Sequence, residues 1–200
     1  MSLLFNLCRL DCYKLLSQKY TFIIFALVSV VMMLFVPQSI YLLSLIMSYF
    51  VGLTIITLDE QSHCNYLYSR LAASRKNIVT ARFVLFFIQS LCITAILFLI
   101  GYFSPFSQMD PSLIYLTIIS FCMSMIFLGF MQAFSFYFKL NTVRFIAIFI
   151  YVMLFTSFNN LPALTFLLPS SLALVISTLV IYLGCLIVAM KLYTRKQFID

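Results

Sequence analysis

Long runs of hydrophobic residues fill most of this chain, and short polar stretches separate them. Six runs are long enough for apolar helices, at about residues 20–36, 40–58, 78–103, 112–138, 143–160 and 170–190. A helix needs about 20 mostly apolar residues to cross the hydrocarbon core of a bilayer. We therefore expect an all-α integral membrane protein with six transmembrane helices in one domain over residues 1–200.

Residues 1–19 follow a different pattern, in which leucines recur every three or four positions. The leucines are Leu3, Leu4, Leu7, Leu10, Leu15 and Leu16, and the polar residues between them include Asn6, Arg9, Asp11 and Lys14. This spacing predicts an amphipathic interfacial helix with its polar side outward in the headgroup region. Cys8 and Cys12 lie one turn apart, where palmitoylation and ordinary packing are both compatible with the sequence.

The longest polar interruption, residues 59–77, lies between the second and third runs. It holds the acidic pair Asp59 and Glu60, the single histidine His63, and several basic residues. We expect a short helix from His63 to Leu71, followed by Ser74 as the N-cap of the next helix. A polar segment between two membrane helices is a natural contact site for a soluble partner.

Composition and charge narrow the functions that fit. Hydrophobic residues make up 64% of the chain and charged residues 8%, with a mean hydropathy of +1.15, whereas soluble domains hold roughly 25% charged residues. The four glycines stand alone in apolar runs, so the chain has no P-loop for ATP. All twelve basic residues flank apolar runs, which favours lipid headgroups over nucleic acid as their partners.

The basic residues also predict the topology. On a six-helix map all twelve fall on one side of the membrane. By the positive-inside rule, both termini and residues 59–77 are expected in the cytoplasm. Residues 162–169, which are apolar but too short to span and carry prolines at both ends, are expected to dip into the outer leaflet.

Away from their ends, the apolar runs contain neutral polar residues but no Asp, Glu, His, Lys or Arg, which argues against ion-coupled transport and intramembrane catalysis. Gln89 and Gln132 are expected to bond neighbouring helices, with a place on a substrate path as the alternative. Ser44, Ser48 and Gly52 recur at every fourth position, a small-residue pattern that lets membrane helices approach closely. His63 beside Cys64 lacks further ligands for a metal, and no cofactor is expected.

The segment from Tyr66 to Val84, YLYSRLAASRKNIVTARFV, resembles the cytoplasmic loop of small ABC-2-type exporter permeases. The matching features are Tyr66-Leu67, the Ser74-Arg75-Lys76 run and the basic Arg82, with Asp59-Glu60 just upstream. The chain departs from the family at Ala72-Ala73, where a proline is usual. In size and composition it is similar to the permease subunits of staphylococcal phenol-soluble modulin exporters.

This resemblance implies a half-permease in a bacterial cell membrane, paired with a second permease chain and with cytoplasmic ABC ATPase subunits. It implies that residues 59–77 form the coupling segment, and it assigns ATPase contacts to Asp59, Glu60, Tyr66, Leu67, Arg70, Leu71, Arg75 and Lys76. The expected cargo is an amphipathic substrate, such as a cytolytic or antimicrobial peptide or a lipid, that moves outward. The alternative is a membrane scaffold or accessory subunit that transports nothing.

Overall fold

The computed structural model describes residues 2–35, 40–61, 74–103, 111–159 and 171–195, and all of its regular elements in this part are helices. They are α1 (Ser2–Ser17), α2 (Lys19–Phe35), α3 (Ile40–Gln61), α5 (Arg75–Tyr102), α6 (Pro111–Ser135), α7 (Leu140–Asn159) and α9 (Ser171–Arg195). A helix lies over each of the six apolar runs. The expectation of an all-helical chain is confirmed for the part described.

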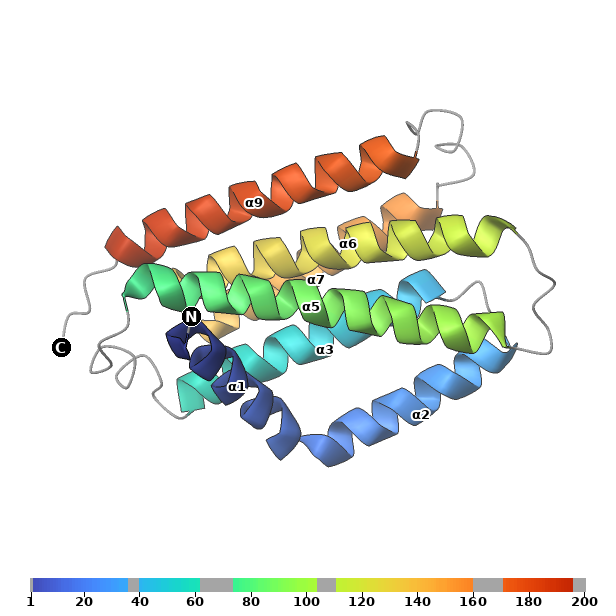
Figure 1. The fold of residues 1–200 in the computed structure, drawn as a ribbon, viewed down its shortest axis with the longest axis horizontal. Coiled ribbons are helices and arrows are strands. Elements are labelled where there is room, and N and C mark those ends of the chain that lie inside the picture. The colour runs from blue at the N-terminus through green and yellow to red at the C-terminus, as the bar shows by residue number, and fades with distance from the viewer. Residues whose placement is uncertain (1, 36–39, 62–73, 104–110, 160–170, 196–200) are drawn as a thin grey trace.

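The long helices lie side by side with their ends at two opposite faces of the bundle (Figure 1). Helices α3, α6 and α9 run in one direction, and α2, α5 and α7 run in the other. Helix α6 is central, because it packs against α3, α5, α7 and α9. Helix α1 crosses the bundle at an angle near the end where α5 begins and α9 ends.

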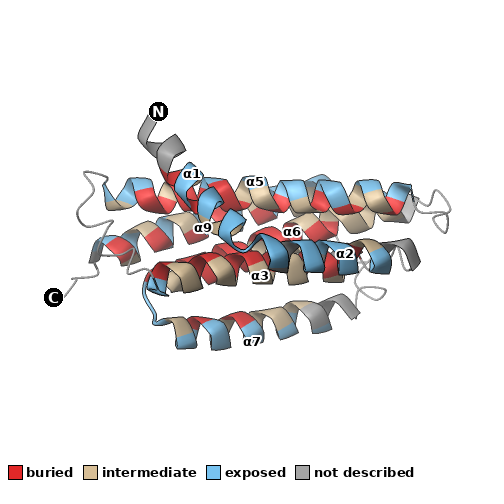
Figure 2. Cartoon of the chain, turned by 90° about the horizontal axis from the view of Figure 1, so that it is seen from below, coloured by how far each residue is buried: buried red, intermediate tan, exposed pale blue. Residues whose placement is uncertain are grey.

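Four of these helices are long and apolar enough to cross a membrane among the residues described. They are Leu42–Gln61, Arg75–Tyr102, Leu113–Ser135 and Leu172–Thr194. The apolar part of α7, Leu140–Leu154, is shorter. The expected number of six transmembrane helices therefore stays a prediction. The outer helix faces are exposed in Figure 2 and carry many large apolar side chains, as expected where lipid is the solvent.

The core lies along both sides of α6. On one side, apolar side chains of α5 and α6 pack against α9, and the Tyr182 hydroxyl donates a 2.7 Å hydrogen bond to the carbonyl oxygen of Phe83. On the other side, Phe86, Phe127 and Leu128 pack among α3, α5, α6 and α7. Helix α6 contributes to both clusters and therefore lies between α9 on one side and α3 and α7 on the other.

The small residues of α3 lie where this helix meets α6. Ser44 and Ser48 are fully buried. A Cβ atom added at Gly52 would lie 2.3 Å from Cε of Met131 and 3.2 Å from a methyl carbon of Leu128, both on α6. The lack of a side chain at Gly52 therefore allows the close approach of α3 and α6.

Helix α1 is oriented differently from the sequence expectation. Asp11 is buried together with Leu7, whereas Leu10 and Leu16 are exposed. The expectation that Asp11 lies on the outward polar side of this helix is therefore wrong. Leu7 and Asp11 are four residues apart and share a helix face, and this face is turned toward the bundle because Asp11 finds cationic partners there.

Candidate functional site

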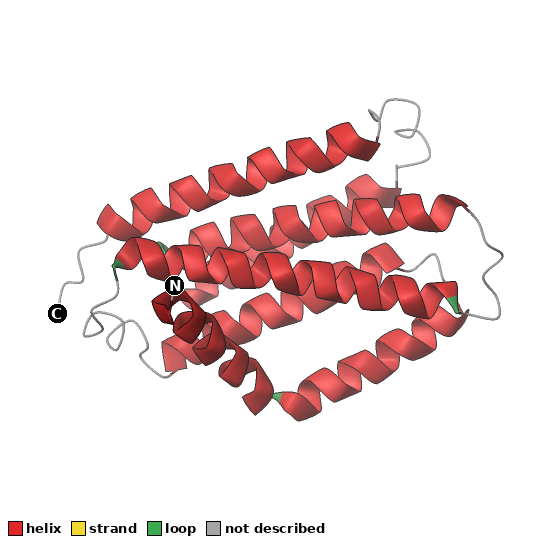
Figure 3. Ribbon diagram, viewed as in Figure 1, coloured by secondary structure: helices red, strands yellow, loops and turns green. Residues whose placement is uncertain are grey.

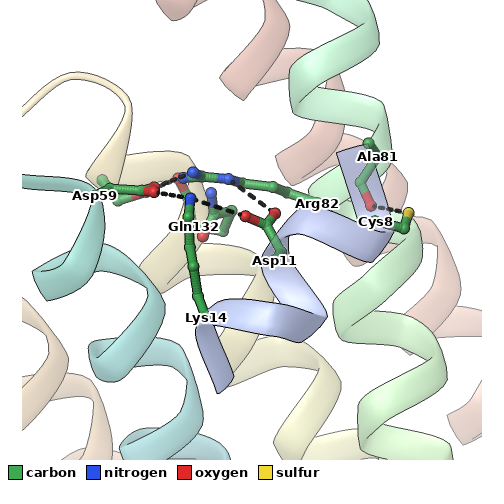
Figure 4. A network of polar contacts seen from close by, with 8 residues as sticks. Cys8, Asp11, Lys14, Asp59, Ala81, Arg82 and Gln132 are labelled. Atoms are coloured by element: carbon green, nitrogen blue, oxygen red, sulfur yellow. Dashed lines mark hydrogen bonds and ion pairs between the residues drawn. The ribbon is translucent and has the colours of Figure 1, made fainter. Parts of the chain in front are cut away.

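Four charged side chains meet at the end of the bundle where α1 crosses it (Figure 4). Arg82 of α5 forms ion pairs with Asp59 of α3 and with Asp11 of α1, the latter at 3.5 Å. Lys14 of α1 bonds the same two carboxylates, with 3.1 Å between Nζ and an oxygen of Asp11. We call Asp11, Lys14, Asp59 and Arg82 the charge network.

The charge network is removed from water. The Asp11, Arg82 and Asp59 side chains are 3%, 6% and 9% exposed, and that of Lys14 is 13% exposed. Isolated charges are very costly to bury, so they are found paired and hydrogen-bonded. Two carboxylates and two cations make the network neutral, and the Arg82 guanidinium also lies 5.6 Å from the ring centre of Phe136, directly after the end of α6.

Local helix geometry brings these charges together. Asp11 and Lys14 are three residues apart on α1 and therefore project from the same side. Asp59 lies in the last turn of α3, and Arg82 lies two turns into α5. The Cys8 thiol adds a contact to the same helix, because it donates to the carbonyl oxygen of Ala81 at 3.4 Å. The network thus joins α1 to the two helices that flank residues 62–73.

A cleft of about 170 Å³ opens beside the charge network. Asp59 and Arg82 lie in its lining, together with Glu60, Lys139 and Tyr193. Its other lining residues are Ile56, Ser135, Phe136, Phe138 and Leu140. Glu60 and Lys139 are exposed, so a carboxylate from α3 faces the same space as an ammonium group from the α6–α7 turn.

The residues expected to contact an ATPase fall into three environments. Tyr66, Leu67, Arg70 and Leu71 lie outside the described residues, as do the expected helix from His63 to Leu71 and the expected outer-leaflet segment 162–169. Glu60 and Lys76 are exposed, whereas Asp59 is buried in the charge network. Arg75 is half-buried and donates to the carbonyl oxygens of Tyr193 and Thr194, the latter at 3.2 Å.

Ser74 begins α5 as the sequence predicts. Its backbone is extended, and its hydroxyl oxygen accepts a hydrogen bond from the Asn77 amide at 3.3 Å. This contact satisfies one of the free amide groups in the first turn of the helix. The segment between α3 and α5 therefore ends at a defined helix start, eight residues before Arg82.

Sequence reasoning did not place Asp11, Lys14 and Arg82 in one cluster with Asp59. The available signal was the identity of Asp11 as one of five acidic residues in the chain, four positions after Leu7 on the same helix face. The described residues contain no cluster of three or more side chains that could hold a metal ion. The arrangement can hold helices together and transmit motion between them.

A family model described as ABC-2 family transporter protein matches residues 6–195. No curated protein and no solved structure matches the chain.

Proposed function

Because the chain belongs to the ABC-2 transporter family, we propose that it is the permease subunit of an ATP-driven exporter and that residues 59–77 receive the motion of a separate ATPase. The sequence has no P-loop, so the energy for transport must come from another subunit. The proposed assembly has two ATPase subunits and a second permease chain, identical or related, in a bacterial cell membrane with both termini cytoplasmic.

The charge network is the observation that supports this role. Residues 62–73 are bounded by the end of α3 and the start of α5, and Asp59 and Arg82 join these two helices by a buried ion pair. Force applied to the segment would therefore move α3 and α5 together rather than bend one of them. Asp11 and Lys14 extend the same connection to α1.

Within the segment, Tyr66, Leu67, Arg70 and Leu71 are the proposed anchor on the ATPase, because tyrosine and arginine are enriched where interfaces concentrate binding energy. Glu60 and Lys76, which are exposed at the two flanks, would contact acidic or basic groups around it. Asp59 and Arg75 would act from within the permease, through Arg82 and the end of α9 respectively.

The proposed cargo is an amphipathic molecule, such as a cytolytic peptide or a lipid. The resemblance of Tyr66–Val84 to exporter permeases supports outward movement, and the similarity in size and composition to phenol-soluble modulin permeases supports a peptide. Candidate peptides and lipids can be ranked by their stimulation of ATP hydrolysis in the purified complex.

The decisive experiment combines Tyr66→Asp and Leu67→Asp and measures how much ATPase co-purifies with the tagged chain from native membranes. The matched control is Phe103→Asp, which places an acid on an exposed aromatic position at the opposite end of α5. We expect the double variant to lose the ATPase while the control retains it. Retention of the ATPase and of transport by the double variant would instead favour the scaffold function.

A further inference from the structure

A second group of polar side chains lies in the interior of the bundle. Several side chains have buried nitrogen or oxygen atoms without a hydrogen-bond partner among the described residues: Ser48, Gln89, Ser90, Ser124 and Gln132. Ser48, Ser90, Ser124 and Gln132 are fully buried, at 0% exposure. The interhelical bonds expected for Gln89 and Gln132 are therefore not found in the part described.

The contacts between helices place these residues at successive depths. Gly52 lies against Leu128, and α3 and α6 run in the same direction (Figure 1). Ser48 and Ser124 each lie four residues before these two positions, on the same helix faces. They therefore come to the same level, about 6 Å farther from the charge network. Ser44 and Ser120 repeat the relationship one turn beyond.

Helix α5 contributes to the same interior. It runs opposite to α3 and α6, and Arg82 fixes its level against Asp59 and Phe136. Ser90 lies eight residues along, about 12 Å deeper, near the level of Gly52 and Leu128. The four fully buried residues Gln132, Ser90, Ser124 and Ser48 thus form a series, which we call the polar seam.

Gln132 joins the polar seam to the cleft. Ser135, three residues later on the same side of α6, and Phe136, directly after the helix, line the cleft. Figure 4 draws the Gln132 side chain beside the Asp59–Arg82 pair. A hydroxyl can satisfy itself on a carbonyl of its own helix, as Thr94 does on the carbonyl oxygen of Ser90 at 2.8 Å. The Gln132 amide has two donors and an acceptor, and one such bond would not satisfy it.

We propose that the polar seam is a water-binding pathway that opens at the cleft and reaches the middle of the permease between α3, α5 and α6. Unpartnered polar groups are costly in a dry membrane interior, and water both donates to and accepts from amides and hydroxyls. The pathway would place hydrated contacts along the face where α3 and α6 meet. Such contacts exchange partners easily, so these helices could shift against each other without breaking a fixed bond.

Single cysteines test this proposal in a chain whose six native cysteines are replaced by alanine. Gln132→Cys, Ser90→Cys and Ser124→Cys each report one depth of the polar seam in membrane vesicles of the intact transporter. The probe is silver ion, which is small enough to follow a narrow water path, applied at the side that carries the cleft. After each silver exposure the protein is dissolved in detergent and treated with maleimide. The loss of maleimide labelling with exposure time gives the rate at which silver reacts with the thiol.

Two controls separate a hydrated path from burial and from depth. Ile88→Cys lies two residues from Ser90 on the exposed face of α5 and reports the lipid-facing surface. A chain that keeps Cys122 alone reports a buried position off the polar seam, because this side chain bonds Thr178 of α9. We expect all three seam positions to react about tenfold faster than both controls, because silver reacts with the thiolate that forms in water.

The proposal would be overturned if Ser90→Cys and Ser124→Cys reacted with silver no faster than the controls. That result would indicate that the native hydroxyls donate to carbonyl oxygens of their own helices. Failure of the cysteine chains to fold would appear as aggregation during size-exclusion chromatography. The near-isosteric Ser90→Cys in the native-cysteine chain then supplies the measurement, with maleimide at residue 90 located by mass spectrometry. The result does not depend on the proposed function, because thiol reactivity is read without an ATPase or a substrate.

Discussion

Asp59 and Arg82 form a buried ion pair that joins the last turn of α3 to the second turn of α5. Twenty-two residues separate them in sequence, and most of the proposed coupling segment lies between. Asp11 pairs with Arg82 and Lys14 pairs with Asp59, and both of these residues come from α1. The pair therefore closes a loop in the chain at the point where a bound partner would apply force.

The first prediction concerns the stability of the charge network. Arg82→Gln should leave two buried carboxylates with Lys14 alone, and loss of one partner from a buried pair costs about 3–5 kcal/mol. Such a loss corresponds to a fall of about 6–20 °C in the thermal midpoint of a chain of this size, measured in detergent. The combined Asp59→Asn and Arg82→Gln variant should recover part of it, since Asp11 and Lys14 can still pair. An equal or lower midpoint for the double variant would contradict a paired role.

The second prediction concerns Gly52. Gly52→Leu should drive a side chain into Met131 and Leu128, and overpacking of this kind costs about 1–3 kcal/mol. Gly184→Leu is the matched control, because a Cβ atom there meets nothing within 4 Å. We expect a lower thermal midpoint only for the Gly52 variant. Equal midpoints would show that α3 and α6 separate without cost.

Helices α1 and α5 differ in how much of their structure the sequence predicts. Apolar runs locate helices by length alone, and the Ser74 N-cap is a local bond between residues three apart. Both were therefore predictable. The charge network depends on contacts between residues up to 71 positions apart, such as Asp11 and Arg82. No periodic pattern in one helix encodes such a partner.

Asp11 illustrates the physical reason. A leucine-rich helix with scattered charges is predicted to be amphipathic, with its charged side chains facing water. Within the protein, Asp11 gains more from Arg82 and Lys14 than from the headgroup region, while Leu10 and Leu16 on the outer face suit lipid. Which face of α1 is turned toward the bundle therefore depends on partners from other helices. The same holds for Gln132, whose surroundings are set by α3 and α5 as well as its own helix.

The third prediction concerns the thiol of Cys12. Burial, with the Asp11 charge as a second cause, raises the pKa of this thiol above its ordinary value. A raised pKa leaves less thiolate at neutral pH, so alkylation should be slow at pH 7 and should increase as pH rises beyond about 8.5. Maleimide labelling followed by mass spectrometry across this range measures it, with an unfolded α1 peptide as control. A profile identical to that of the peptide would contradict a folded, partly desolvated α1.

The fourth prediction concerns topology. All twelve basic residues fall on one side of the six-helix map, so both termini should lie in the cytoplasm. A cleavable tag at either end should resist protease added to intact cells and become accessible in inside-out vesicles. A tag after residue 106, in the expected outer connection, should behave in the opposite way. Cleavage of a terminal tag on intact cells would reject the assigned orientation.

The last prediction separates two roles for Arg75. This side chain donates to the carbonyl oxygens of Tyr193 and Thr194, which lie in the last turn of α9, where carbonyls extend beyond the reach of amides of their own helix. A cation at a helix C-terminus also interacts favourably with the helix dipole, by about 0.3–1 kcal/mol. Arg75→Met should therefore speed amide hydrogen exchange in the last turn of α9.

Lys76→Met is the matched control, because it removes the same charge from the adjacent, exposed position. We expect it to leave exchange in α9 unchanged and, if Lys76 contacts an acidic group of the partner, to reduce ATPase recovery. Equal exchange in the two variants would show that the Arg75 bonds do not hold the end of α9. Reduced ATPase recovery with unchanged exchange in Arg75→Met would place Arg75 on the partner surface, as the resemblance to exporter permeases implies.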